Sequence, residues 1–227
     1  MAKPPASVAA FLSGKRFGVA AVLALAGLAA GADSASAKQY PDPWQSEFPS
    51  RIALVGFGAS GADSAYGHFE VLLRDRWGQP VPFVTVICEL EAGSDFRIAS
   101  DQQDPGLHVV CPHQTVYSVS GGDGIASFTI IGGGRSPLPP PGAANRILFS
   151  LDGVPWGSAP CFAFDLNGTS GVSLADVSLW AADFFGGLGA ARMDFDADGR
   201  VSLTDLSLLA AVFFGAGSAQ SAATYCP

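Results

Sequence analysis

Short apolar runs alternate with turn-forming residues along most of the chain. From residue 51 onward, runs rich in apolar and β-branched residues are separated by stretches that contain Gly, Pro or Asp. Such runs predict β-strands, because these side chains suit a pleated, half-buried surface. The runs that predict strands are 51–55, 68–73, 83–90, 107–111, 115–118, 125–131 and 146–151. Short strands at this spacing are typical of a β-sandwich, so we expect an all-β domain over residues 51–154.

Proline-rich stretches flank and interrupt this region. Residues 38–50 contain Pro41, Pro43 and Pro49 without periodicity, and they predict an extended lead-in. The stretch 135–141 contains four prolines, which cannot join a sheet interior, so we expect a long loop there. The Pro- and Gly-rich stretch 155–160 predicts a linker to a second domain.

The C-terminal part contains one pattern twice, over residues 164–186 and 193–215 with an offset of 29 residues. Each copy is a polar segment that runs into an apolar helix, predicted over 177–185 and 206–214. In the second copy, acidic residues alternate and a glycine follows where a sharp turn is needed. This is the oxygen-ligand spacing of an EF-hand-type calcium loop. The expected ligands are Asp194, Asp196, Asp198, the carbonyl of Arg200, Ser202 and Asp205.

The first copy is a weaker match to the same loop. Its corresponding residues are Asp165, Asn167, Thr169, Gly171, Ser173 and Asp176. Thr169 replaces a carboxylate, and Ser170 stands where the turn favours glycine. Fewer charged ligands and a backbone that turns less easily predict that this loop binds calcium less tightly or not at all.

Loop plus following helix, duplicated and with Asp at the twelfth loop position, resembles the type I dockerin over about 60 residues. The resemblance implies a small α-helical module over residues 161–227 that binds Ca²⁺ and attaches its protein to a cohesin-type domain or a cell-surface scaffold. Dockerins contact cohesins largely through the first turn of each helix. It therefore implies partner contacts at Leu174, Ala175, Leu203 and Thr204. Many cellulosomal dockerins carry a hydroxyl-rich pair there, and this chain has only Thr204, which leaves the partner open.

A looser resemblance covers the β region. The run 69–75, the turn 78–82 and the stretch 123–129 resemble bacterial Ig-like domains of the invasin type over roughly 100 residues. The resemblance implies a sandwich fold with a spacer or adhesive role and no reaction. The expected fold class is therefore mixed: an N-terminal Ig-like sandwich and a C-terminal dockerin-like module.

The charge of the chain favours a cation over nucleic acid as a partner. The formal net charge is −8, and only 14% of the residues are charged. An acidic chain of this size repels phosphate backbones, so we expect no nucleic-acid partner.

The first 37 residues predict a signal peptide. Lys3, Lys15 and Arg16 precede an apolar run over 17–30, and Ala35-Ser36-Ala37 gives a small-residue cleavage pattern. The run is shorter than the roughly 20 residues that span a bilayer, and no later segment is long enough. We therefore expect a secreted or cell-surface protein; an uncleaved N-terminal anchor is the alternative.

Export would place the four cysteines in an oxidising compartment. Four cysteines allow three pairings. We expect Cys88 to pair with Cys111 and Cys161 with Cys226, because each pair then stays within one proposed domain. Buried free thiols are the alternative. The dockerin resemblance adds that the chain ends meet, so that a Cys161–Cys226 bond would join them.

These features predict an interaction protein and no enzyme. Two alternatives remain open: a carbohydrate-binding module on a dockerin, with Trp77, Tyr117 or Trp156 as sugar-stacking platforms, or a small polysaccharide hydrolase. A glycan array separates the first alternative from a spacer, which binds no glycan. Turnover of polysaccharides would indicate the second.

Overall fold

The structure is a computed structural model that describes residues 39–58, 61–62, 64–135, 145–169, 171–186, 191–215 and 224–227. The expected signal peptide (1–37), residues 136–141 of the expected Pro-rich loop, and Ser170 lie outside the described residues. All described residues belong to one compact unit, residues 38–227.

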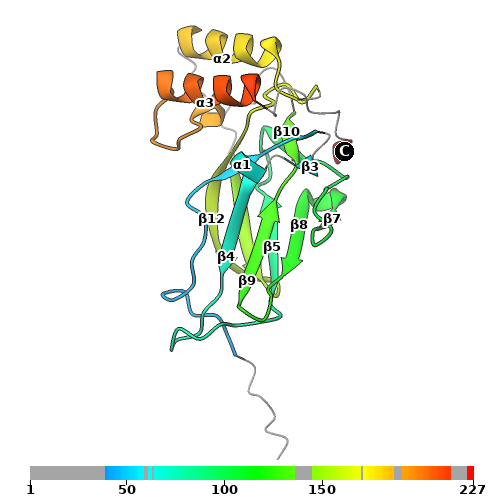
Figure 1. Ribbon diagram of the computed structural model, residues 1–227, viewed down its shortest axis with the longest axis vertical. Helices are drawn as coiled ribbons and strands as arrows, with labels where there is room; N and C mark the ends of the chain where they lie inside the picture. Colours follow the sequence, from blue (N-terminus) through cyan, green and yellow to red (C-terminus); the bar gives the residue numbers. More distant parts are fainter. Residues whose placement is uncertain are drawn as a thin grey trace, which may run out of the picture. The chain divides into compact units, whose positions relative to one another are not determined.

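The architecture is mixed: a large β region is followed by two helices near the C-terminus (Figure 1). The strands are β1 (Ile52–Leu54), β2 (Phe57–Gly58), β3 (Gly61–Ala62), β4 (His68–Leu72), β5 (Thr85–Leu90), β6 (Phe96–Ile98), β7 (His108–Val110), β8 (Thr115–Val119), β9 (Ile125–Thr129), β10 (Gly132–Gly134), β11 (Arg146–Leu151) and β12 (Val154–Ala163). The α-helices are α1 (Ser64–Gly67), α2 (Leu174–Gly186) and α3 (Leu203–Phe214), and the 3₁₀ helices are η1 (Cys111–His113) and η2 (Ala191–Met193).

The largest sheet has six strands and is curled, in the order β1-β12-β11-β5-β8-β7. β1 joins β12 in parallel, and the other neighbours are antiparallel. Alternate residues of β5 and β11 face the core, as period-2 strands require. The inward residues are Val86, Cys88 and Leu90 on β5 and Ile147, Phe149 and Leu151 on β11.

A smaller antiparallel pair, β4 and β9, lies in front of the curled sheet in Figure 1. Its buried side chains Val71, Ala126 and Phe128 belong to the same core as those of β5 and β11. The predicted turn at 121–124 leads from β8 of the large sheet to β9 of this pair, and Gly124 has a φ of +74°, which favours glycine. Each of the seven predicted runs contains a strand, namely β1, β4, β5, β7, β8, β9 and β11.

Residues 155–160, the expected linker, lie inside β12. Pro155 and Pro160 pair with Ser150 and Arg146 of β11. Within the described residues, β1 pairs only with the last part of β12, residues 161–163. Among the described residues, no strand pairs with the other edge of residues 154–160. A proline can therefore stand there without breaking a hydrogen bond between strands.

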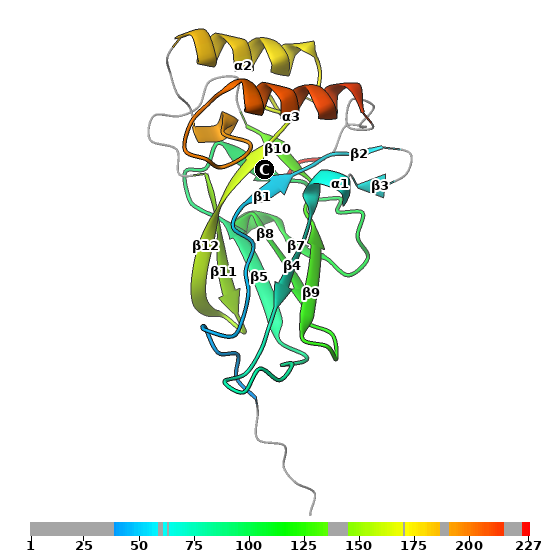
Figure 2. The same cartoon turned by 60° about the vertical axis from the view of Figure 1, so that its left-hand side comes forward.

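The C-terminal helices pack directly on the β region. One hydrophobic core contains β-region residues together with Trp180 of α2 and Leu209 and Val212 of α3. Phe164, which follows β12, lies 5.0 Å, ring centre to ring centre, from Phe195, which follows η2. Figures 1 and 2 show α2 and α3 side by side and running in opposite directions above β10 and β12.

A buried ion-pair network joins the helices to the β region. Arg192 of η2 is fully buried at its side chain, and its Nη1 lies 3.1 Å from Oδ2 of Asp95, just before β6. Its Nη2 lies 2.9 Å from Oδ2 of Asp183 on α2. Burial raises the pKa of Asp95 more than the nearby Arg192 lowers it.

The disulfide joins Cys111 to Cys226, so both predicted pairings are wrong. The end of the chain returns to the β region, where Tyr225 pairs with Ala99 and the N–H of Cys226 donates to the carbonyl of Ile98 at 2.8 Å. Cys88 on β5 and Cys161 on β12 are buried free thiols. Burial raises the pKa of both, so they remain protonated.

A disulfide is consistent with an extracellular location. Among the described residues, no helix is long and apolar enough to cross a membrane.

Candidate metal centre

Three carboxylates converge in the second repeat. Asp194, Asp196 and Asp198 each offer an oxygen, and these oxygens all lie within 4.8 Å of one another. They stand on a tight loop between η2 and α3. A cluster of hard oxygen ligands on one loop suits a hard divalent cation, because such cations prefer carboxylate and carbonyl oxygens.

The backbone of this loop curls inward around Asp194. Its Oδ1 accepts the N–H of Asp198 at 3.0 Å, and its Oδ2 accepts the N–H of Gly199 at 2.8 Å. Gly199 has a φ of +84°, which confirms the need for glycine at the predicted turn, and Ala197 also lies in the left-handed region. These two turns bring the three carboxylates to the same side of the loop.

Asp205 and Ser202, two further predicted ligands, start helix α3. Ser202 is the N-cap, and its side chain accepts the N–H of Thr204 at 3.1 Å, while Asp205 completes a capping box. Asp205 Oδ1 also accepts the N–H of Phe195 at 2.7 Å, and its Oδ2 accepts that of Ser202 at 2.7 Å. Asp205 therefore connects the start of the loop, at Phe195, to its end, at Ser202. Its carboxylate is not one of the three that converge.

The electrostatics of the group favour a positive charge. Burial raises the pKa of Asp194, and the contact with Asp196 raises it further. Carboxylates this close together repel each other unless a proton or a cation lies between them. The loop also borders a pocket of about 310 Å³, lined in part by Asp194, Ala197 and Gly199. The carbonyl of Arg200, the remaining predicted ligand, belongs to an exposed residue whose N–H donates to Asp198 Oδ1 at 2.8 Å.

In the first repeat, the carboxylate at the first loop position accepts hydrogen bonds from the loop itself and from the C-terminal segment. Asp165 is buried, and its Oδ1 accepts the N–H groups of Gly168 (2.7 Å) and Thr169 (3.3 Å). Its Oδ2 accepts the N–H of Gly171 at 3.0 Å and the hydroxyl of Tyr225 at 2.9 Å. A carboxylate offers about four lone-pair sites, so these donors occupy the whole acceptor capacity of Asp165.

The other predicted ligands of the first loop are hydrogen-bonded in the same manner. Asp176 Oδ1 accepts the N–H groups of Leu166 (2.8 Å) and Asn167 (3.2 Å). Its Oδ2 accepts both the N–H and the hydroxyl of Ser173, each at 2.8 Å. Asn167 Oδ1 accepts the N–H and the hydroxyl of Thr169. Among the described residues, the first loop forms no group of three converging acidic or imidazole ligands.

The predicted partner-binding residues are exposed at the start of each helix. Leu174 and Leu203 expose 69% and 67% of their surface, and Ala175 and Thr204 beside them are exposed as well. Large aliphatic side chains this exposed at corresponding positions of both repeats favour a role outside the core.

Sequence reasoning missed the residues that attach the repeats to the β region. Tyr225, Arg192 and Gly134 contact Asp165, Asp95 and Asp165 respectively, all far from them in sequence, and no local pattern marks them. The one signal was Cys226, because a disulfide from it to the β region would place its neighbour Tyr225 there as well.

Comparisons with protein-family models, with curated proteins and with solved structures find no match to this chain.

Proposed function

We propose that this protein is exported and binds a partner domain through a calcium-dependent, dockerin-like module carried on an Ig-like β domain. The partner class is a cohesin-type domain or a cell-surface scaffold. One observation carries the proposal: the two repeats expose the same apolar side chains at corresponding positions.

The duplicated surface follows one stripe along each helix, which we call the helix stripe. Its members are Leu174, Ala175, Ser178, Ala182 and Phe185 on α2, and Leu203, Thr204, Ser207, Ala211 and Phe214 on α3. Phe185 and Phe214 at the helix ends expose 82% and 83% of their surface. Solvent-exposed apolar side chains of this size cost solubility, so their presence at the same positions of both repeats favours a binding role.

A cation bound at the second loop would order the start of α3, where part of the helix stripe lies. Asp194, Asp196 and Asp198 would hold Ca²⁺ with their carboxylates, and the bound ion supplies a charge that offsets their mutual repulsion. Asp205 and Ser202 then connect that loop to the first turn of α3, where Leu203 and Thr204 begin the stripe. Calcium binding would thereby fix the orientation of the residues that meet the partner.

We expect the exported chain to bind a cohesin-type domain in calcium and to lose that binding in a chelator. The Leu174→Glu/Leu203→Glu variant should bind at least about 100-fold more weakly, because it places charges on two exposed anchor residues. It should take up calcium as the parent does. The Asp194→Asn/Asp198→Asn variant should lose both the calcium uptake and the partner binding. Biolayer interferometry against a panel of cohesin domains, with calorimetric calcium titration, measures both.

Val154→Glu provides the matched control. Val154 exposes 59% of its surface at the start of β12, outside the two repeats, so the variant should bind like the parent. Partner binding that survives chelation, or that is unchanged in Leu174→Glu/Leu203→Glu, would count against the proposal. So would a parent chain that takes up no calcium and shows no calcium-dependent rise in melting temperature.

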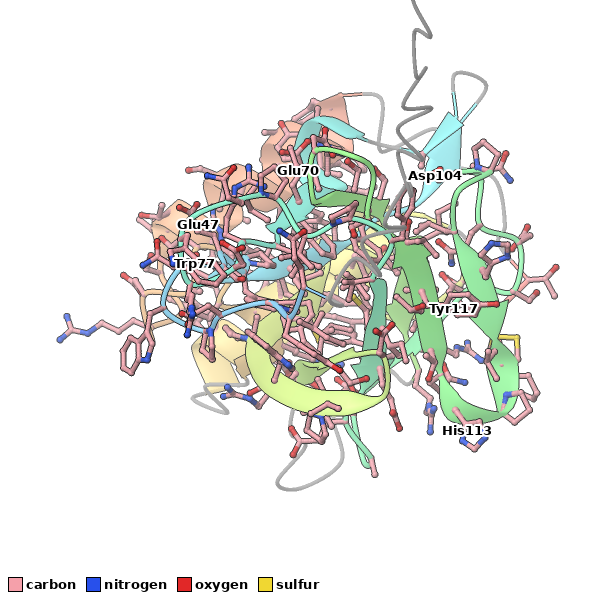
Figure 3. The ribbon with its side chains drawn as sticks, turned by 90° about the horizontal axis from the view of Figure 1, so that it is seen from below. Glu47, Glu70, Trp77, Asp104, His113 and Tyr117 are labelled. Carbon is pink, nitrogen blue, oxygen red and sulfur yellow. A yellow bond between two sulfur atoms is a disulfide. The ribbon has the colours of Figure 1, made fainter. Side chains whose placement is uncertain are left out.

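A second candidate function is glycan binding on the outer face of the curled sheet. A trough of about 410 Å³ is lined by Thr85, Ile87, Glu89, Val110, His113, Thr115 and Tyr117. Tyr117 stacks on His108, with ring centres 4.9 Å apart. Hydroxyl, carboxylate and imidazole groups beside a partly exposed aromatic ring suit a neutral sugar. Figure 3 shows His113 and Tyr117 on one side and Trp77 on the opposite side.

The three aromatic candidates differ in what they can offer to a sugar. Trp77 exposes 67% of its surface, and the Arg76 guanidinium lies 3.9 Å from its ring centre. Trp156 stacks on Phe48 at 5.9 Å. If the trough binds glycans, Tyr117→Ala should weaken binding on a glycan array roughly tenfold, whereas Trp77→Ala should leave it unchanged. A parent chain that binds no glycan removes this candidate.

A further inference from the structure

The two repeats differ in what occupies the carboxylate at the first position of each loop. In the second loop, Asp194 accepts two backbone N–H groups within the described part of the chain, and its carboxylate stays close to those of Asp196 and Asp198. In the first loop, Asp165 accepts three backbone N–H groups and the Tyr225 hydroxyl. A cation at the first loop would have to displace donors that already satisfy this carboxylate.

Tyr225 belongs to the C-terminal segment, Thr224–Pro227, which is held on the β region at several points. Cys226 is bonded to Cys111, and its N–H donates to the carbonyl of Ile98 at 2.8 Å. The Tyr225 ring lies under the Arg97 guanidinium, 4.5 Å from ring centre to Cζ. Figures 1 and 2 both place the C-terminus beside β10. The hydroxyl is therefore presented to Asp165 by a part of the chain that is fixed elsewhere.

The first loop also lies directly against β10. The N–H of Gly134 donates to the carbonyl of Asp165 at 2.6 Å, and Arg97 Nε donates to the carbonyl of Gly134 at 3.3 Å. A Cβ on Gly134 would collide with the carbonyl of Leu166, and a Cβ on Gly168 would collide with that of Gly134. These glycines allow the backbone of the loop and the strand to touch. At the second loop, by contrast, a Cβ on Gly199 would meet no described atom within 4 Å.

We propose that Tyr225, held by the C-terminal segment, closes the first loop in place of a cation, so that the chain binds one divalent cation, at the second loop. The one-cation part rests on the proposed function, and the closure of the first loop stands independently of it. The first repeat is then a structural loop that keeps α2 and its part of the helix stripe in place whether or not calcium is present. Calcium controls only the half of the stripe on α3.

Amide hydrogen exchange of the exported chain, in calcium and in chelator, tests this directly. Peptides that cover residues 165–173 should stay protected in chelator, whereas those that cover residues 194–202 should gain protection only in calcium. Tyr225→Phe keeps the ring under Arg97 and removes only the hydroxyl. It should speed exchange in the first loop about tenfold and leave the second loop unchanged. Tyr66→Phe, in which the ring packs edge-on against Phe164, is the matched control and should change neither loop.

Calorimetric titration of the same samples with calcium should give one cation per parent chain and none for Asp194→Asn/Asp198→Asn. Two cations per parent chain, or first-loop protection that appears only with calcium, would overturn the closure by Tyr225. These two readouts use the parent chain, so they decide the matter even if Tyr225→Phe does not fold. A first loop that is protected in chelator, in a chain that binds no cation, would support the closure and reject the calcium-dependent function.

Discussion

Replacing Arg192 by methionine should lower the free energy of unfolding by about 3–5 kcal/mol. The side chain of Arg192 is fully buried and touches two carboxylates, Asp95 at 3.1 Å and Asp183 at 2.9 Å. Methionine fills much of the same space but leaves both carboxylates without their counter-charge in a buried site. Urea unfolding followed by tryptophan fluorescence measures the loss, since Trp180 lies in the core that this network adjoins.

The loss in this variant should shrink as the pH falls. The pKa of Asp95 is already raised by burial in the presence of Arg192, and without the guanidinium it should rise further. A folded state whose acid has a raised pKa binds more protons than the unfolded state, so its relative stability increases as pH decreases. The deficit of the variant should therefore be largest near pH 7 and should decline toward about pH 4, where an Asp of the unfolded chain is about half protonated.

Two further variants control for the loss of the arginine itself. Arg51 lies at an exposed position and donates to the carbonyl of Phe195 at 2.8 Å, so Arg51→Met should cost about 1 kcal/mol or less. Adding Asp95→Asn and Asp183→Asn to Arg192→Met removes the unpaired charges and should recover a large part of the stability. An Arg192→Met chain as stable as Arg51→Met would show that the buried network does not hold the helices on the β region.

The strands were predictable because their signals are local. In β5 and β11, alternate apolar residues mark the buried face, and the turn at 121–124 is marked by its glycines. β12 was missed because its prolines normally exclude a strand interior, and they are tolerated here because no strand among the described residues pairs with one edge of residues 154–160. β10 was missed because three glycines carry no strand preference; its position depends on the first loop packing against it.

The candidate metal centre was predictable to the extent that spacing determines it. Alternating carboxylates followed by a glycine identified Asp194, Asp196, Asp198 and the turn at Gly199, and the structure brings these carboxylates together. The hydrogen bonding that distinguishes the first loop from the second could not be derived in full from the sequence. Thr169 indicated a weaker site, but the Tyr225 hydroxyl on Asp165 comes from a residue 60 positions away. Such contacts depend on the path of the whole chain.

Replacing Cys111 and Cys226 by serine should lower the free energy of unfolding by about 4 kcal/mol. The bond closes a loop with a sequence separation of 115 residues, and it restricts the unfolded chain far more than a short loop would. Cys111→Ser and Cys226→Ser should each cost nearly as much as the double variant, because either change removes the same bond. Thermal and urea unfolding of the three variants measure the effect.

Unfolding experiments on variants of the two free cysteines test which cysteines form the disulfide. Cys88→Ala and Cys161→Ala remove a buried sulfur without breaking a bond, so each should cost about 1 kcal/mol. Alkylation of the denatured, unreduced chain should label Cys88 and Cys161 only, whereas the folded chain should resist labelling because burial keeps both thiols protonated. Had the pairs been Cys88–Cys111 and Cys161–Cys226, each alanine variant would cost as much as a lost disulfide, and no cysteine would be labelled. The bond observed instead fastens the end of the chain to the β region, which is what holds Tyr225 against the first loop.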